Sequence, residues 1–143
     1  MPNVQVTSNV PSKGVDTAKA MAAISKGVAT ALDKSEQVVM VQLNLDTPML
    51  FGASDAPCAM IHLRSIGKVD AQHNPTVRLA DEGSLLKIFS SKLDNITSQT
   101  ASVLTETVSQ ELNIPQDRIF MNIDDVQRSN WAKGGVLIPE PKQ

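Results

Sequence analysis

The chain has 143 residues, of which 41% are hydrophobic but only 3% aromatic, and its formal net charge is −2. This length suits one domain that buries about 68–70% of its unfolded surface, so the core must consist mainly of aliphatic side chains. The slightly acidic charge balance excludes the basic surface by which proteins bind nucleic acids. A single cysteine, Cys58, excludes an intrachain disulfide.

No apolar run approaches the ~18 residues of a membrane-spanning helix, and the first residues lack the charged-then-apolar pattern of a signal peptide. We therefore expect a cytoplasmic protein that binds no membrane, with secretion without a signal peptide as the alternative. The sequence has neither the ligand spacing of a metal site nor a phosphate-binding loop. We expect no metal and no organic cofactor.

The first half of the chain predicts a strand, a helix and two further strands. Residues 3–8 alternate as a strand does, and residues 15–32 carry apolar side chains three or four apart, as in an amphipathic helix. Residues 37–45 are predicted as a strand that is apolar on both faces. After a turn-rich loop, residues 59–66 alternate most clearly of all. The predicted apolar stripe of the helix consists of Val15, Ala18, Met21, Ile24, Val28 and Leu32.

The second half of the chain predicts a similar order. A short helix is expected around residues 84–93, and a second full helix over residues 96–112, although its many serines and threonines are weak helix formers. Residues 118–124 alternate as a strand, and residues 136–138 are a short strand candidate.

A faint internal repeat relates residues 32–40 to residues 112–120, because in both a helix ends and a strand begins across a short polar turn. Two β-α-β halves follow, each with parallel strands joined by a right-handed crossover. The predicted fold class is therefore α/β (α+β), with one four-stranded sheet and two helices on one of its faces. Apolar residues left on the other face would argue for oligomerisation. Those residues are Val38, Met40, Met60 and Ile66.

Six short blocks carry a family likeness: Pro2 after Met1, Lys34 after the first helix, and residues 48–52, 56–59, 65–68 and 117–122. In order and spacing they resemble the macrophage migration inhibitory factor and D-dopachrome tautomerase family, within the 4-oxalocrotonate tautomerase superfamily. The likeness covers about residues 1–70 and 94–131. It implies a single tautomerase-like domain over residues 1–143, and a homotrimer whose sheets form a barrel.

The resemblance also implies an activity, the keto–enol tautomerisation of phenylpyruvate-like α-keto acids and of dopachrome analogues. The family's catalytic base is the amino-terminal proline, here Pro2, which is exposed when the initiator methionine is removed. Lys34 and Ile66 match the lysine and isoleucine that line the family's pocket. Asn122 matches an asparagine that the adjacent subunit contributes, and Phe120 stands where many members have tyrosine. A protein receptor is a further implied partner.

A secondary amine accepts a proton from carbon only when it is neutral, whereas ordinary α-amino groups titrate near ~7.7–8.0. Burial beside Ile66 and Phe120 would lower the pKa of the Pro2 amine, and the Lys34 ammonium would lower it further. Lys34 would also bind the substrate carboxylate or stabilise the enolate. The alternative is a solvated charge at a helix C-terminus, and for Asn122 it is a surface hydrogen bond.

The sequence departs from the family pattern at Ile61, which replaces the family's second cysteine, and in two longer segments. Residues 72–92 or so look inserted and are expected to be peripheral, and residues 132–138 replace the usual ending. These departures mildly favour another function, a cytokine-like binding protein with a vestigial pocket. A third hypothesis keeps the proline for hydratase or decarboxylase chemistry, which needs additional pocket arginines. His62 and Arg64, two apart on one strand, could form an acid–base pair, but the trimer implied by the resemblance would turn them into the barrel channel.

Overall fold

The computed structural model describes residues 1–66 and 82–139, leaving aside the side chains of residues 82–94. Its main elements are β1 (Asn3–Ser8), α1 (Thr17–Leu32), β2 (Met40–Asn44), β3 (Ala59–Ile66), α2 (Glu82–Leu112) and β4 (Ile119–Val126). Short elements connect or follow them: the 3₁₀ turns η1 (Glu36–Val38), η2 (Gln116–Arg118) and η3 (Arg128–Asn130), and the strands β5 (Ala132–Lys133) and β6 (Val136–Leu137).

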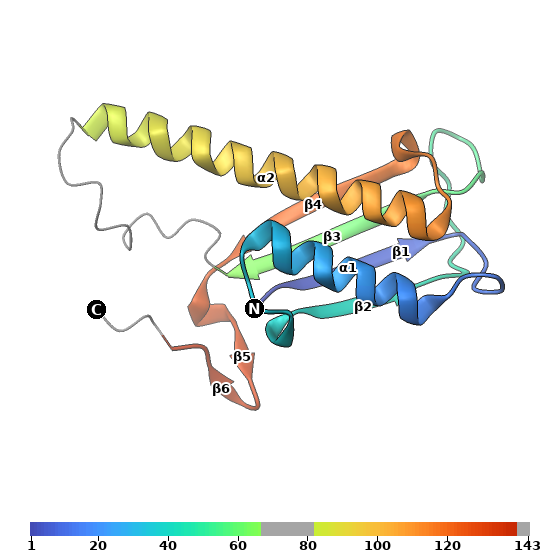
Figure 1. Ribbon diagram of the computed structural model, residues 1–143, viewed down its shortest axis with the longest axis horizontal. Coiled ribbons are helices and arrows are strands. Elements are labelled where there is room, and N and C mark those ends of the chain that lie inside the picture. The colour runs from blue at the N-terminus through green and yellow to red at the C-terminus, as the bar shows by residue number, and fades with distance from the viewer. Residues whose placement is uncertain (67–81, 140–143) are drawn as a thin grey trace.

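The four long strands form one mixed sheet in the order β2-β1-β3-β4. β1 pairs in parallel with β2, β3 pairs in parallel with β4, and the central pair β1–β3 is antiparallel. Both helices cover the same face of this sheet (Figure 1). The predicted α+β fold with two β-α-β halves is therefore confirmed.

The core lies between the sheet and the two helices. Val4 and Val6 of β1 face Leu63 and Ile61 of β3, and all four are fully buried. Ile24, Val28 and Leu32 of α1 and Leu104 and Val108 of α2 complete the core. Cys58 is buried too.

The predicted stripe of α1 was wrong at its N-terminal end. Ala18 and Met21 are exposed, whereas Ala20 and Ala29 are buried. The buried row follows the spacing 20, 24, 28, which keeps side chains on one face of a helix. Met21 lies about 60° from the middle of that row, at its margin, and is 36% exposed.

The internal repeat is confirmed in the backbone. Each helix ends at a residue in the left-handed region, Asp33 with φ 50° and Asn113 with φ 53°. The amide of the following residue then donates to a carbonyl of the helix, Lys34 N to Ala29 O at 2.9 Å and Ile114 N to Ser109 O at 3.1 Å. A 3₁₀ turn comes next in both halves and delays the strand. β2 consequently begins at Met40 and not at the predicted residue 37.

The prediction of two separate helices before β4 was wrong, because α2 is continuous over 31 residues. The spacing 85, 89, 93, 96, 100, 104, which is apolar except at the buried Thr100, runs on without a break, and Asp94 and Asn95 disfavour a helix only weakly. The first turns of α2 extend past the end of the sheet (Figure 1). Residues 67–81, which include the first part of the insertion predicted at about 72–92, lie outside the described residues. Within the part that is described, no helix is both long and apolar enough to cross a membrane.

The face of the sheet opposite the helices is mostly polar, which corrects the expectation of a broad apolar surface. Met40 is 64% exposed and Met60 is half-buried, but Ile66 is only 4% exposed and Val38 lies in η1, outside the sheet. The pairing register and the alternation of burial put many polar side chains on this face. They include Gln5, Gln42, Asn44, His62, Arg64, Asn122 and Asp124.

A small hairpin, β5–β6, follows the sheet. Gly134 and Gly135 both have positive φ, 60° and 82°, as a tight two-residue turn requires. The hairpin is closed at its base by a bond from Ile138 N to Trp131 O at 2.9 Å. Val136 and Leu137, which form the predicted short strand, are exposed.

Candidate active site

Pro2 lies at the start of the central strand β1, under the helices. Its side chain is less than 2% exposed, and its carbonyl accepts a hydrogen bond from Met40 N at 2.9 Å. Continuing the antiparallel register of β1 and β3 places Pro2 opposite Ser65, with Ile66 next along β3. The hydroxyl of Ser65 is buried and has no hydrogen-bond partner among the described residues. The proline ring is thus held at the end of a central strand of the sheet.

A cavity of about 300 Å³ lies at this end of the sheet. Three segments far apart in the sequence meet here: the start of the chain, the entry into β2, and the β5–β6 hairpin. The lining residues are Met1, Pro2, Asn3, Val38, Met40, Trp131, Ala132, Lys133 and Gly134. This part of the wall is largely apolar, and the one charged side chain among these described residues is that of Lys133. A hydrophobic acid would fit such a surface.

The amino group at this end of the chain favours its neutral form. Burial lowers the pKa of the Met1 amine below its ordinary value of 8.0, and the charges of Lys34 and Arg128 lower it further. Each cause acts in the same direction, because burial and nearby cations both disfavour an ammonium. An amine exposed at Pro2 by removal of Met1 would meet the same surroundings.

Lys34 follows the left-handed residue Asp33, which turns the chain from α1 towards η1. This connection passes beside the N-terminus (Figure 1). The Lys34 side chain is exposed and lines an open hollow of about 600 Å³ beside the end of α1, not the wall of the Pro2 cavity. Its charge nonetheless lowers the pKa of the terminal amine. Lys34 is therefore close enough to the start of the chain to act on it electrostatically.

Phe120 and Asn122 lie far from Pro2 within one chain. Phe120 is level with Thr7, five residues along β1 from Pro2, which is roughly 16 Å at ~3.3 Å per residue. Its ring is 59% exposed and packs on Phe51 with the centroids 4.7 Å apart. Asn122 is exposed on the open face of β4. A single chain therefore brings together Pro2, Ile66 and Lys34 but neither of these two.

Comparison with known protein families shows which family this chain belongs to. A family model described as macrophage migration inhibitory factor (MIF) matches residues 1–94, more than half of the chain. The chain belongs to the MIF family. It is 29% identical over 135 residues to an MIF homologue of Brugia malayi and 28% identical over 136 residues to MIF of Xenopus tropicalis. Both matches cover 94% of this chain and 96% of the relative.

Solved MIF structures share the fold. The MIF homologue of Prochlorococcus marinus aligns with a TM-score of 0.74 at 23% identity, over 96% of this chain and 99% of that one. MIF of Toxoplasma gondii aligns with a TM-score of 0.68 at 24% identity, over 94% and 98% of the two chains. The sheet and both helices are therefore common to the family.

Several of the blocks that resemble the MIF family are joined by one side chain, Arg118. Its guanidinium donates to the carbonyls of Pro57 and Ala56, both at 2.9 Å, and lies 5.2 Å from the centroid of the Phe51 ring. It also reaches the carbonyls of Phe51 and Ser54 at 3.3–3.4 Å. The planar, multiply donating guanidinium suits this task. This part of the likeness therefore reflects how the loop before β3 is held.

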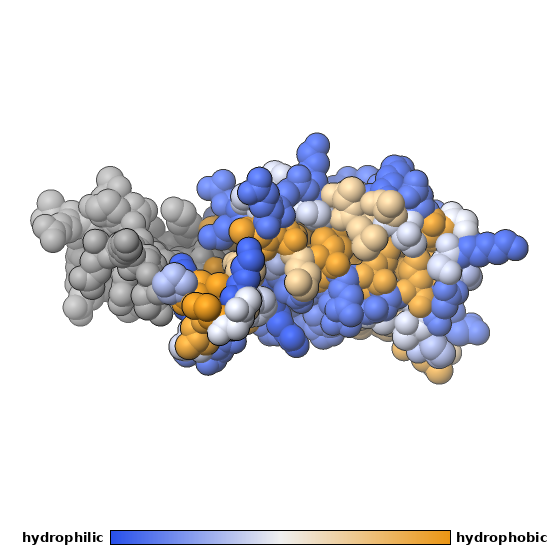
Figure 2. Space-filling model, turned by 90° about the horizontal axis from the view of Figure 1, so that it is seen from below, coloured by the Kyte–Doolittle hydropathy of each residue, from blue (hydrophilic) through white to orange (hydrophobic). Residues whose placement is uncertain are grey.

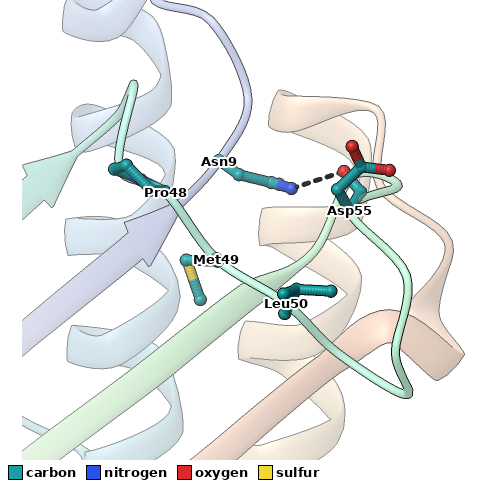
Figure 3. A pocket seen from close by; sticks show the side chains of 5 residues that line it. All are labelled: Asn9, Pro48, Met49, Leu50 and Asp55. Atoms are coloured by element: carbon teal, nitrogen blue, oxygen red, sulfur yellow. Dashed lines mark hydrogen bonds between the residues drawn. The ribbon is translucent and has the colours of Figure 1, made fainter.

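A second concavity, of about 470 Å³, lies at the opposite end of β1 from Pro2 (Figure 3). Pro48, Met49 and Leu50 form one side of it. Asn9 spans the other side, donating to Asp55 O at 2.9 Å and accepting from Cys58 N at 2.9 Å. The amide nitrogen and the amide oxygen of Asn9 both hold the loop, and Asp55 is the titratable side chain among the described residues that line this hollow.

His62 and Arg64 do not form an acid–base pair at the Pro2 cavity. Both lie on the open face of β3, in register with Asn122 and Asp124. Arg64 Nε is 3.7 Å from Asp124 Oδ2, and both side chains are about half exposed. Such surface ion pairs stabilise a fold by about 0–1 kcal/mol.

Sequence reasoning missed the part of the cavity wall that comes from the C-terminal hairpin. Trp131 and Lys133 line the cavity, and Arg128 acts electrostatically on the amine there. The available signal was the position of residues 132–138, which replace the usual ending of the MIF family. Within that segment Lys133, just before the Gly134–Gly135 turn, adds a positive charge to the cavity wall.

Proposed function

We propose that this protein is a keto–enol tautomerase of phenylpyruvate-like α-keto acids and dopachrome analogues, with the Pro2 amine as the general base once Met1 has been removed. The observation that carries the proposal is the apolar cavity at the N-terminus, where burial and two cations lower the pKa of the terminal amine. A base must be neutral near the working pH to be effective. Membership of the MIF family, which includes tautomerases, supports the same reaction.

In the proposed reaction the Pro2 nitrogen takes a proton from the methylene carbon beside the keto group, and the carbonyl oxygen becomes an enolate. The same proton returned to that oxygen completes the enol. The Lys34 ammonium stabilises the negative charge of the carboxylate or of the developing enolate. Val38, Met40 and Trp131 offer apolar surface to the ring of the substrate. No step needs a co-reactant.

The test is a spectrophotometric phenylpyruvate assay on protein whose mass shows a free Pro2. We expect saturable tautomerisation well above the buffer-catalysed rate. Protein that has a verified Pro2 terminus and gives no such activity would leave the cytokine-like binding function as the better hypothesis. A hydratase or decarboxylase would reveal itself in the same assay by a product other than the enol.

We further propose a homotrimer in which Phe120 and Asn122 of one chain approach the Pro2 cavity of the next. β2 is an edge strand with Met40 exposed on it, and exposed edges pair readily with other chains. Seen from the β2 edge, hydrophobic side chains gather between polar ones (Figure 2). The exposed Val136 and Leu137 add to this apolar surface.

Light scattering should therefore report about three times the chain mass of 15.4 kDa. Burial of Met40, Val136 and Leu137 between chains provides the driving force. A monomer that persists at micromolar concentration would contradict the trimer. It would also remove Asn122 and Phe120 from the proposed site, because their own chain holds them far from Pro2.

A further inference from the structure

Among the described residues that line the Pro2 cavity, Lys133 carries the one side-chain charge. It lies in β5, just before the Gly134–Gly135 turn, and the base of the hairpin is held by the bond from Ile138 N to Trp131 O. No aspartate or glutamate is among the described residues that line the cavity. Within this described part of the wall the cation is not neutralised, and the hairpin presents it beside the apolar surface of Trp131.

Lys133 and Lys34 approach the N-terminus from different elements. Lys34 belongs to the connection between α1 and η1, whereas Lys133 belongs to the β5–β6 hairpin (Figure 1). The proposed mechanism assigns one substrate carboxylate to Lys34. Lys34 lies beside the cavity and Lys133 lies in its wall, and two cations at separate places are more than a substrate with one carboxylate requires.

We propose that Lys133 determines substrate specificity, by binding a second acidic group at the end of the substrate distant from the α-keto acid. This inference rests on the proposed function of the Pro2 cavity and narrows its substrate class to dianionic keto acids with an apolar middle. Trp131, Val38 and Met40 contact that middle, and the two lysines bind its ends. The lysine is a point charge on a flexible stem, so it suits a carboxylate whose position varies.

The test uses ligands that bind without turnover. Phenylpropionate has one carboxylate, and para-carboxyphenylpropionate has the same skeleton with a second one at the far end. Trp131 is the only tryptophan of the chain and lines the cavity, so its fluorescence reports binding of either ligand. Titrations compare the parent protein with Lys133→Gln, both with a free Pro2.

We expect the parent protein to bind the dianion more tightly than the monoanion. Lys133→Gln should weaken binding of the dianion about threefold, the size expected for an exposed charge pair, and change binding of the monoanion by less than about twofold. Added salt should weaken dianion binding in the parent protein, because it screens exposed charges. Lys133→Arg keeps the positive charge and should still bind the dianion more tightly than the monoanion.

Lys13→Gln is the matched control, because Lys13 is an exposed lysine in the loop between β1 and α1, at the other end of the strand. It should leave both affinities unchanged. Equal affinities of the parent protein for the two ligands, or an equal effect of Lys133→Gln on both, would overturn the proposal. Because these titrations involve no proton transfer, their outcome is independent of whether Pro2 acts as a base.

Discussion

One extra residue ahead of Pro2 should lower kcat/KM for phenylpyruvate by at least about two orders of magnitude, the lower end of what a positioned general base contributes. The reason is chemical, since the nitrogen of a peptide bond cannot accept the proton that a free secondary amine accepts. Protein that retains Met1 is the simplest such form. Intact-mass measurement separates the two forms, and the assay is then run on each.

Two variants make this test specific. Pro2→Gly supplies a primary amine that is still a base but is less rigidly held, so activity should fall without being abolished. A cleavable extension should restore activity when a protease releases Pro2, which shows that the fold was intact throughout. Full activity with Met1 retained would exclude the proline mechanism, and His62 would be the next candidate base.

The strands and their succession along the chain could be predicted because the sequence signals for them are local. Alternation over residues 59–66 reflects burial of one face of β3, and the matching polar turns at residues 32–40 and 112–120 mark equivalent connections. The break placed between the two predicted helices failed because residue propensity at Asp94 and Asn95 is a weak effect. A helix that continues through such residues loses only tenths of a kcal/mol at each.

The site was predicted only in part, because its wall is assembled from distant segments. Pro2, Lys34 and Ile66 could be found by resemblance, and β1, the α1–η1 connection and β3 do bring them to one end of the sheet. Trp131 and Lys133 reach the cavity through a hairpin whose first strand has only two residues, too short for any periodicity. Asn122 and Phe120 would reach a Pro2 cavity only in the proposed trimer, and no pattern within one chain can place contacts between chains.

Replacing Lys34 with Ala should change the pH profile of kcat/KM as well as its size. In the parent protein the profile should rise with pH through an ionisation below the ordinary α-amino value of ~7.7–8.0, because burial, Lys34 and Arg128 all lower the pKa of the amine at this site. The neutral amine is the active form, so activity is present above that pKa and is lost as the pH falls through it.

Lys34→Ala removes one of the two cations, so the ionisation should move up towards the ordinary value without reaching it, since burial and Arg128 remain. Activity should therefore fall more at acidic pH than at alkaline pH. KM for phenylpyruvate should also rise, about threefold to tenfold, because a partly solvated charge pair with the carboxylate is lost. Lys34→Arg keeps the positive charge, so the pH profile of kcat/KM should stay as in the parent protein.

Lys26→Ala is the matched control for Lys34→Ala. Lys26 is an exposed lysine of α1 that lines the same open hollow as Lys34, but its charge is not among the causes that lower the pKa of the terminal amine. Its replacement should leave both the ionisation and KM unchanged. If Lys34→Ala changes KM alone, the lysine binds the carboxylate without tuning the base. If it changes neither, Lys34 is a solvated charge at the end of α1, as its exposure alone would indicate.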